Sequence, residues 1–295
     1  MNTPLWTALI TPFDRKGDIH FDDLESIVRL QEHAGNGILL LGSTGEGLAL
    51  GDDEKKSVVE FVTGLKPSVP LMAGVGGFNL KHQKEWVEYL NESEVDALLP
   101  VMPLYAKPGL AGQELWFRSI LDASAKPCML YNIPSRTGAK LNPEVLSKLA
   151  GHPNMWAVKE ASGSVDEYQA LKRSAPDVEF YSGDDALLPF FVTAGCGGLV
   201  SVSSNVWPDE TRAYVEESLN GRTQNLFPLW NDAVKALFSS PNPVPVKVLM
   251  KEKGMIQTSV LRLPLTADDH PDRDGLLASD KAVKQWYSEL QYKSK

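Results

Sequence analysis

Lys159 is the residue whose type and position offer the clearest chemistry in this sequence. It closes a strand-like apolar run that begins at Met155, and a polar turn containing Gly163 follows it. Burial disfavours the charged form of an amine, so the pKa of a lysine at the end of a buried strand falls from about 10.4 toward neutrality. A neutral amine is a nucleophile that forms a Schiff base with a carbonyl substrate. The alternative is a lysine that extends past the strand end into water, and both interpretations fit this segment.

Two hydroxyl groups occupy a loop after another apolar run. Ser43 and Thr44 lie in the sequence Gly42-Ser-Thr-Gly45-Glu46. Backbone N–H groups and two hydroxyls at a helix entrance suit a small anion such as a carboxylate. A tight turn that caps the next helix explains the same residues without any ligand.

Two tyrosines and an arginine complete the candidate groups. Tyr105 follows the fourth apolar run, Tyr131 ends the fifth, and Arg136 lies in the segment after it. A free phenol has a pKa of about 10, so Tyr131 needs a neighbouring charge or hydrogen bond to transfer protons near neutral pH. Without such a neighbour, Tyr131 is a half-buried core residue.

The elements that carry these groups alternate regularly along the chain, as short apolar runs and amphipathic stretches of helical period. The predicted strands are Leu5–Ile10, Gly37–Leu41, Leu71–Ala73, Ala97–Pro100, Cys128–Tyr131, Met155–Lys159, Val178–Tyr181 and Gly198–Val202. The predicted helices between them lie near 21–34, 52–65, 81–93, 112–125, 142–150, 165–174 and 184–194, with Asp22, Asp52, Asn142 and Ser164 at or near helix starts. This alternation favours a closed parallel (β/α)8 barrel, a TIM barrel, over an open doubly wound sheet. In such a barrel the strand ends form one active-site rim.

The chain continues beyond the eighth strand with further helical pattern. The predicted helices of this tail are Glu210–Leu219, Gln224–Ala236, Val246–Lys253 and Lys281–Gln291. We therefore expect a catalytic barrel over residues 1–225 and a C-terminal helical region, packed on the barrel, over residues 226–295.

Composition limits the class of protein. The chain has 295 residues, and its net charge of −9 without a Lys/Arg-rich run gives no reason to expect nucleic-acid binding. The beginning of the sequence shows no signal peptide, and the apolar runs are too short to span a bilayer. The two cysteines, Cys128 and Cys196, lie in apolar contexts that fit reduced thiols. We expect a soluble, cytoplasmic protein.

Several other chemistries are disfavoured. Gly74-Val-Gly76-Gly77 lacks the third glycine of a dinucleotide-binding fingerprint, and no P-loop occurs. The five histidines show no metal-ligand spacing and no paired-cysteine motif exists, which disfavours a zinc-dependent aldolase. We expect no metal site.

These motifs together resemble the pyruvate-dependent class I aldolase family that includes dihydrodipicolinate synthase and N-acetylneuraminate lyase. The resemblance runs from Thr7-Ala-Leu-Ile-Thr-Pro-Phe13 to Leu261-Arg-Leu-Pro-Leu265 and is most specific at the Ser43 loop, at Tyr131-Asn-Ile-Pro134 and at Val158-Lys159-Glu160. It implies a (β/α)8 barrel followed by three C-terminal helices. It also implies that Lys159 binds pyruvate as an imine, which makes a metal or an organic cofactor unnecessary.

The resemblance further implies a role for each pyruvate-site residue. The pyruvate carboxylate would lie on Ser43 and Thr44, aided by backbone near Gly183 and Val200. Within the family, synthases usually carry two threonines at the Ser43 and Thr44 positions, and serine is commoner in the lyases and sugar-acid aldolases. Serine keeps the hydroxyl, so pyruvate binding is expected to survive.

Roles in proton transfer and second-substrate binding follow from the same resemblance. Tyr131, Thr44 and Tyr105 would form a proton relay, with Tyr105 supplied by a neighbouring subunit of a homo-oligomer, a dimer or a tetramer. Pro134-Ser-Arg136-Thr-Gly138 matches the synthases, so Arg136 would bind the carboxylate of L-aspartate-4-semialdehyde, for which a guanidinium is suited.

Two alternatives remain at this point. One is an aldolase that joins pyruvate to a sugar acid or cleaves such a compound, as N-acetylneuraminate lyase does. The other is a non-catalytic metabolite-sensing barrel that keeps the imine without turnover, although binding alone would not need the Tyr131, Arg136 and Thr44 set.

Overall fold

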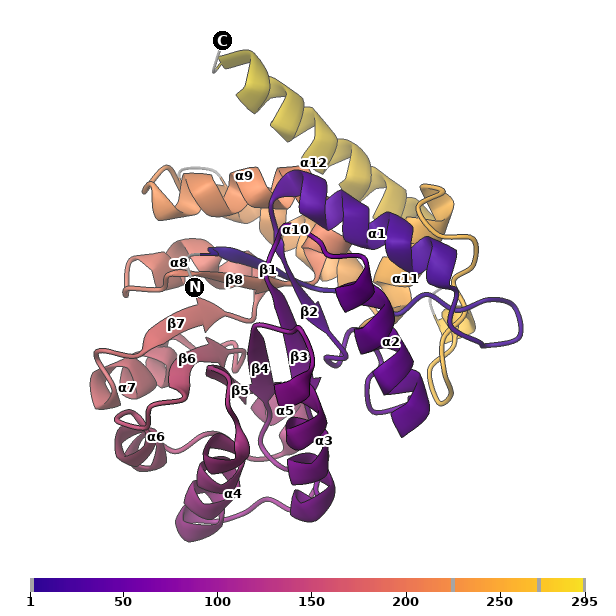
Figure 1. Ribbon diagram of the computed structural model, residues 1–295. Helices are drawn as coiled ribbons and strands as arrows, with labels where there is room; N and C mark the ends of the chain where they lie inside the picture. Colours follow the sequence, from indigo (N-terminus) through magenta and orange to yellow (C-terminus); the bar gives the residue numbers. More distant parts are fainter. Residues whose placement is uncertain (1–2, 224–225, 270–271, 294–295) are drawn as a thin grey trace.

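Eight parallel strands close into a barrel in the order in which they occur along the chain (Figure 1). The computed structural model describes residues 3–223, 226–269 and 272–293. The strands are β1 (Leu5–Ala8), β2 (Gly37–Leu40), β3 (Leu71–Val75), β4 (Ala97–Pro100), β5 (Cys128–Asn132), β6 (Met155–Glu160), β7 (Glu179–Ser182) and β8 (Gly198–Ser201). Parallel pairing of β8 with β1 closes the barrel, so the predicted (β/α)8 fold is confirmed and the open sheet is excluded.

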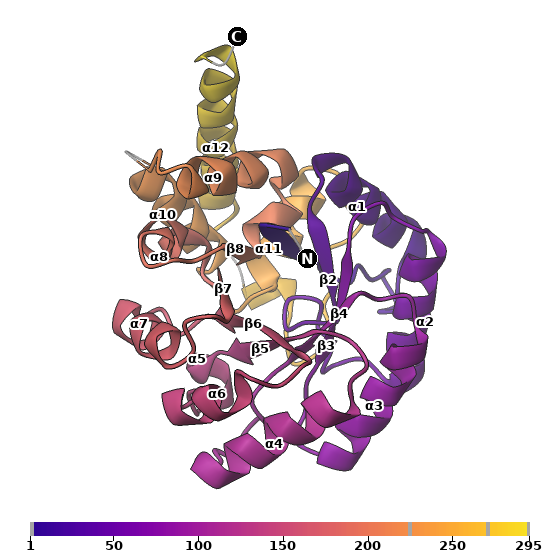
Figure 2. The same ribbon diagram turned by 60° about the vertical axis from the view of Figure 1, so that its left-hand side comes forward.

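Helices cover the outside of this barrel (Figure 2). They are α1 (Phe21–Ala34), α2 (Asp52–Gly64), α3 (Leu80–Glu92), α4 (Leu110–Ala123), α6 (Pro143–Leu149), α7 (Val165–Ser174), α8 (Leu188–Val192) and α9 (Pro208–Leu219). The short helix α5 (Pro134–Thr137) lies instead directly after the carboxyl end of β5. The amphipathic pattern explains their placement, since α1 buries Leu24, Ile27 and Val28 on one face. The predicted helix at 184–194 is divided into a 3-10 turn, Asp185–Leu187, and the short α8.

The predicted helix caps are partly confirmed. Asn142 and Ser164 accept hydrogen bonds from the first turns of α6 and α7. Asp22 and Asp52 are instead first-turn residues. His20 caps α1 through its ring nitrogen, a role that the preference for short polar caps does not predict.

Side chains alternate between the interior of the barrel and the layer beneath the helices, as they must in a strand. The interior cluster contains Trp6, Ala8, Leu39, Met72, Ala97, Leu99, Met129, Tyr131, Ala157, Tyr181 and Val200. The opposite faces join a larger cluster with the helices. Lys159 lies two positions after Ala157 on β6 and therefore faces the interior at the carboxyl end.

Three further helices follow the barrel: α10 (Leu226–Leu237), α11 (Val244–Glu252) and α12 (Arg273–Lys293). Helix α10 packs on the Asp185–Leu187 turn of the barrel and on α12. Helix α12, predicted only as Lys281–Gln291, begins earlier, at Arg273. Figures 1 and 2 show that its C-terminal part projects away from the barrel. The predicted division at residues 225 and 226 falls at the edge of a gap in the described residues and stays a prediction.

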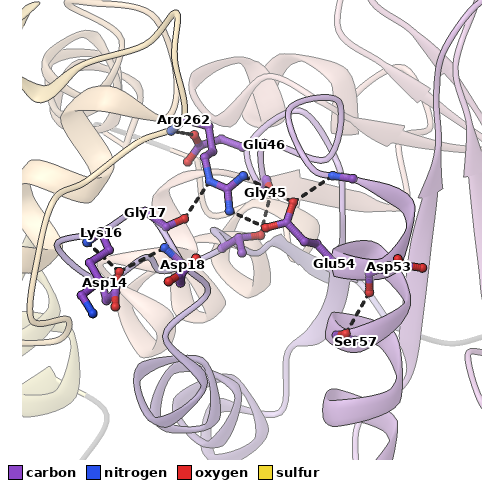
Figure 3. A network of polar contacts seen from close by, with 12 residues as sticks. Asp14, Lys16, Gly17, Asp18, Gly45, Glu46, Asp53, Glu54, Ser57 and Arg262 are labelled. Carbon is purple, nitrogen blue, oxygen red and sulfur yellow. Dashed lines mark hydrogen bonds and ion pairs between the residues drawn. The ribbon is translucent and has the colours of Figure 1, made fainter.

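The C-terminal region holds the loop after β2 through a buried ion pair. Lys247 on α11 donates to a carboxylate oxygen of Glu46 at 2.5 Å, and both side chains are buried. Figure 3 shows the second tie: the backbone N–H of Arg262 donates to the same carboxylate at 2.8 Å, while its guanidinium bonds Gly17 and Glu54. The Gly42–Glu46 loop is thus fixed by residues that lie some two hundred positions later.

We expect Lys247→Met to lower the free energy of unfolding by about 3–5 kcal/mol, because the Glu46 carboxylate would remain buried without its cation. Urea denaturation measures this change. The control Lys251→Met, at an exposed pair with Glu252 on the same helix, should cost about 1 kcal/mol or less. Glu46→Gln combined with Lys247→Met should recover part of the loss. A Lys247 variant as stable as the control would contradict the prediction.

Candidate active site

Lys159 and Tyr131 lie side by side at the carboxyl end of the barrel. They are register partners on the neighbouring strands β6 and β5, so both side chains face the interior. The amine of Lys159 lies 4.3 Å from the centroid of the Tyr131 ring. Only 4% of Lys159 is exposed, so this side chain does not extend past the strand end into water.

Burial changes the acid–base properties of Lys159. Desolvation is the largest cause and lowers its pKa to about 7, with a further lowering by the Arg136 charge and an opposing effect from Asp185. A large fraction of this amine is therefore neutral at physiological pH, as a nucleophile requires.

Gly183 leaves room for this amine. A Cβ atom at position 183 would lie 2.8 Å from Cε of Lys159 and 2.6 Å from Cβ of Ala161. Any side chain would therefore displace Lys159. The sequence suggests Gly183 only as a source of backbone contacts, and the structure adds this steric reason for a glycine.

Tyr131 keeps its proton under ordinary conditions. Burial raises its pKa to about 12, although the charge of Arg136 and a hydrogen bond with Ser43 act in the opposite direction. The neighbours therefore do not turn Tyr131 into a free phenolate. Tyr131 can still transfer a proton when its phenol receives one as it gives one up.

The loop with Ser43 and Thr44 differs from the expected helix entrance. It forms a series of turns, and α2 begins only at Asp52. Leu41 and Glu46 adopt positive φ angles of 58° and 53° on either side of the two hydroxyl residues. Thr44 is 2% exposed, and its Oγ1 accepts a hydrogen bond from the side chain of Asn242 at 2.9 Å.

Arg136 stands between two cavities. It belongs to the short helix α5, directly after β5, and its guanidinium donates to the backbone oxygen of Asn242 at 3.1 Å. One cavity, of about 540 Å³, also contains Ser43, Tyr105 and Tyr131 on its walls. The other, of about 740 Å³, is lined by Arg136 together with Gly183, Asp184 and Asn242.

Tyr105 lies at the outer edge of the site. It is 93% exposed and adopts a positive φ angle of 66° in the loop after β4. It lines the same 540 Å³ cavity as Tyr131 and Ser43. The structure thus brings Tyr105 to the mouth of the site, whereas Val200 is fully buried on β8 inside the barrel.

Asp185 is a buried acid whose importance the sequence does not single out. Its carboxylate accepts hydrogen bonds from the hydroxyls of Ser201 and Ser203, both at 2.5 Å, and from the backbone N–H of Val202 at 3.1 Å. These bonds fix the end of β8, next to Val200. The pair of acids directly after strand seven was the available signal, but only the fold shows that the second points inward.

A closed barrel that buries an amine of pKa about 7 at its carboxyl end has the fold and the nucleophile of a Schiff-base aldolase. The chain belongs to the dihydrodipicolinate synthetase family, whose model matches residues 2–283.

Curated relatives span nearly the whole chain. A 4-hydroxy-tetrahydrodipicolinate synthase of Francisella philomiragia is 47% identical over 293 residues, which cover 98% of this chain and 99% of the relative. The enzyme of that name from Wolbachia pipientis of Culex pipiens is 41% identical and covers 97% of each chain. These findings confirm the predicted family, its lyase class and the predicted function of 4-hydroxy-tetrahydrodipicolinate synthase.

Solved structures agree with this result. The dihydrodipicolinate synthase of Acinetobacter baumannii, crystallised with pyruvate, superposes with a TM-score of 0.90 at 29% identity, covering 96% of this chain and 99% of that one. The 4-hydroxy-tetrahydrodipicolinate synthase of Methylacidiphilum fumariolicum SolV also gives 0.90, at 30% identity over 98% of both chains. Within the described residues, no helix is long and apolar enough to cross a membrane.

The pKa of Lys159 predicts how adduct formation depends on pH. Attack requires the neutral amine, so the initial rate of the borohydride-trapped pyruvate adduct should rise with pH to a plateau, with its midpoint near 7. An unperturbed lysine would keep gaining rate up to about pH 10. Mass spectrometry of the Lys159 peptide measures the adduct, and Lys159→Arg, which stays charged, is the control without labelling. A midpoint above 9 would contradict the desolvated amine.

Proposed function

We propose that this site condenses pyruvate, held as an imine on Lys159, with L-aspartate-4-semialdehyde in diaminopimelate and lysine biosynthesis. The observation that carries the proposal is the buried amine of Lys159 at the end of β6, against the ring of Tyr131. The names of the full-length relatives support the same pair of substrates.

The first half of the reaction uses pyruvate alone. The amine of Lys159 attacks the ketone carbon, and the resulting carbinolamine loses its oxygen as water to form the imine. Loss of a methyl proton then yields an enamine, whose carbon is the nucleophile of the second half. The hydroxyls of Ser43 and Thr44, with backbone at Gly183 and Val200, would bind the carboxylate.

Proton transfer would pass through Tyr131, Thr44 and Tyr105. Loss of water from the carbinolamine needs a proton donor, and attack on the aldehyde leaves an alkoxide that needs one too. Tyr131 lies against Lys159 and holds its proton at neutral pH, so it is placed to supply it. Thr44, together with Tyr105 supplied by a neighbouring subunit, would return the proton to Tyr131.

Arg136 would select the second substrate. Its guanidinium lines both cavities, and its charge is felt by Lys159 and by Tyr131. It is therefore close enough to the reacting groups to bind a carboxylate on an aldehyde that approaches the enamine. A bidentate arginine–carboxylate pair also orients the aldehyde.

The decisive assay offers two aldehydes to the enzyme incubated with pyruvate and without borohydride, because reduction of the imine would prevent formation of the enamine. Condensation with L-aspartate-4-semialdehyde, and not with N-acetylmannosamine, is expected. The opposite preference would indicate the sugar-acid aldolase. An adduct that forms on Lys159 but turns over neither aldehyde would indicate the metabolite sensor.

The assembly and the location belong to the same proposal. Three large apolar or aromatic side chains near this cavity are exposed: Leu48 and Tyr105, which line the 540 Å³ cavity, and Phe78, which lies two residues after the lining residue Gly76. Such exposed side chains suit an interface with a second copy of the chain. We expect a dimer or a tetramer. A cytoplasmic enzyme would keep the buried thiols of Cys128 and Cys196 reduced.

Replacing Arg136 should separate the two substrates. We expect Arg136→Ala to lower kcat/KM for L-aspartate-4-semialdehyde by roughly 100-fold or more, because a charge-assisted pair is lost. The borohydride-trapped pyruvate adduct should still form. Arg118→Ala, at a surface pair with Glu114 on α4, is the matched control and should change neither quantity. Loss of the pyruvate adduct in the Arg136 variant would contradict the assignment.

A shared site predicts complementation between inactive subunits. A mixture of Tyr105→Phe and Lys159→Ala chains should regain activity, because a site with an intact Lys159 then receives Tyr105 from the other chain. In a randomly mixed dimer at most about a quarter of the sites recover. Activity is assayed after subunit exchange has been demonstrated with tagged chains. An inactive mixture of proven mixed oligomers would show that Tyr105 does not act across the interface.

A further inference from the structure

Asn242 joins the two halves of the site, although it belongs to the C-terminal region. It lies two residues before α11 and is only 5% exposed. Its side-chain Nδ2 donates to Oγ1 of Thr44 at 2.9 Å. Its backbone oxygen accepts a hydrogen bond from Arg136 at 3.1 Å. One residue therefore contacts both the hydroxyl assigned to the relay and the guanidinium assigned to the second substrate.

The bond to Thr44 determines where the threonine proton can go. A hydroxyl has one proton to donate and two lone pairs that accept. An amide N–H can only donate, so Asn242 occupies a lone pair of Thr44 and leaves its proton available for another acceptor. In the described part of the chain Oδ1 of Asn242 has no hydrogen-bond partner, so the amide group makes a single bond, the one to Thr44.

Asn242 is itself held firmly in place. The backbone N–H of Lys247 bonds the oxygen of Pro243 in the first turn of α11, which links Asn242 to the helix that carries Lys247. The Lys247 amine pairs with Glu46, two residues after Thr44. Two interactions thus connect the segments around Thr44 and Asn242: the buried ion pair of Lys247 with Glu46 and the hydrogen bond of the Asn242 amide with Thr44. Such a double tie fixes the distance between amide and hydroxyl.

We propose that Asn242 is a positioning residue of the reaction: its side-chain amide orients the Thr44 hydroxyl so that the threonine proton faces the relay. The inference rests on the proposed relay and deepens it. The backbone carbonyl supports Arg136 independently of the side chain. A side-chain substitution should therefore disturb proton transfer and leave the binding of the second substrate largely unchanged.

The first test compares Asn242 with an asparagine that lines neither cavity. Asn242→Ala should lower kcat roughly 10- to 100-fold, the usual effect of removing one partner of a buried hydrogen bond. Its KM for L-aspartate-4-semialdehyde should stay within about threefold, because the carbonyl to Arg136 remains. Asn220→Ala, at the exposed C-terminal end of α9, should behave as the parent enzyme. A kcat within about twofold of the parent for Asn242→Ala would overturn the proposal.

A double-mutant cycle tests whether Asn242 acts through Thr44. Thr44→Val removes the hydroxyl, so adding Asn242→Ala should cost little more in kcat. Effects that multiply would show independent roles and overturn the proposal. Asn242→Asp keeps the shape but cannot donate, and it would accept the Thr44 proton. It should lose as much activity as the alanine variant, and parental activity would overturn the proposal even if the alanine variant did not fold.

A measurement with pyruvate alone separates this proposal from the proposed function. Loss of water from the carbinolamine already needs the relay. The rate of borohydride-trapped adduct formation should therefore fall in Asn242→Ala, while the final amount of adduct at saturating pyruvate stays the same. If the parent enzyme fails to condense L-aspartate-4-semialdehyde, the proposed second substrate is wrong, but this slower adduct formation is still expected. An unchanged rate would overturn the role of Asn242.

Discussion

The burial of one amine at the open end of the barrel is the constraint around which the site is built. Water would keep Lys159 charged and inert, and its removal lowers the pKa to about 7. Three neighbouring residues affect this amine in different ways. Position 183 must be a glycine, because a side chain there would clash with Lys159. The Tyr131 ring packs against the amine, and the charge of Asp185 limits how far the pKa of Lys159 falls. The buried Asp185 is tolerated because backbone and hydroxyl donors surround its carboxylate.

The rim of the barrel is completed by the C-terminal region. The loop with Ser43 and Thr44 contains two non-glycine residues with positive φ, a conformation that costs on the order of 1 kcal/mol each. Contacts from Lys247, Arg262 and Asn242 hold this loop in place. The tail is therefore part of the active site and not only a covering of the barrel. Its buried ion pair also explains why a lysine and a glutamate remain inside the protein, where an unpaired charge would be costly.

The candidate site contains two cavities with different linings. Arg136 lines both of them, while Lys159 is buried at the end of β6. In the proposed reaction the keto acid reacts with this amine, and the carboxylate of the second substrate is bound at the arginine. Asn242 contacts both Thr44 and Arg136, so a single residue would couple the proposed proton relay to the arginine.

The sequence by itself determined the barrel, its family and the position of Lys159 at the end of a strand. Alternating apolar runs specify strands and helices locally, and the motifs around Lys159, Tyr131 and Arg136 are contiguous in the sequence. Both the elements and the motifs can therefore be predicted without knowledge of long-range contacts. The sequence did not predict the N-cap of α1 at His20 or the turns of the Ser43 loop, because the backbone geometry overrode the usual preferences of residues for caps and helix starts. Only the tertiary structure decided that Asn242 touches Thr44 and that the Asp185 carboxylate binds the end of β8. These contacts join residues far apart in the chain, and no local pattern encodes which distant side chains a closed barrel and its tail bring together.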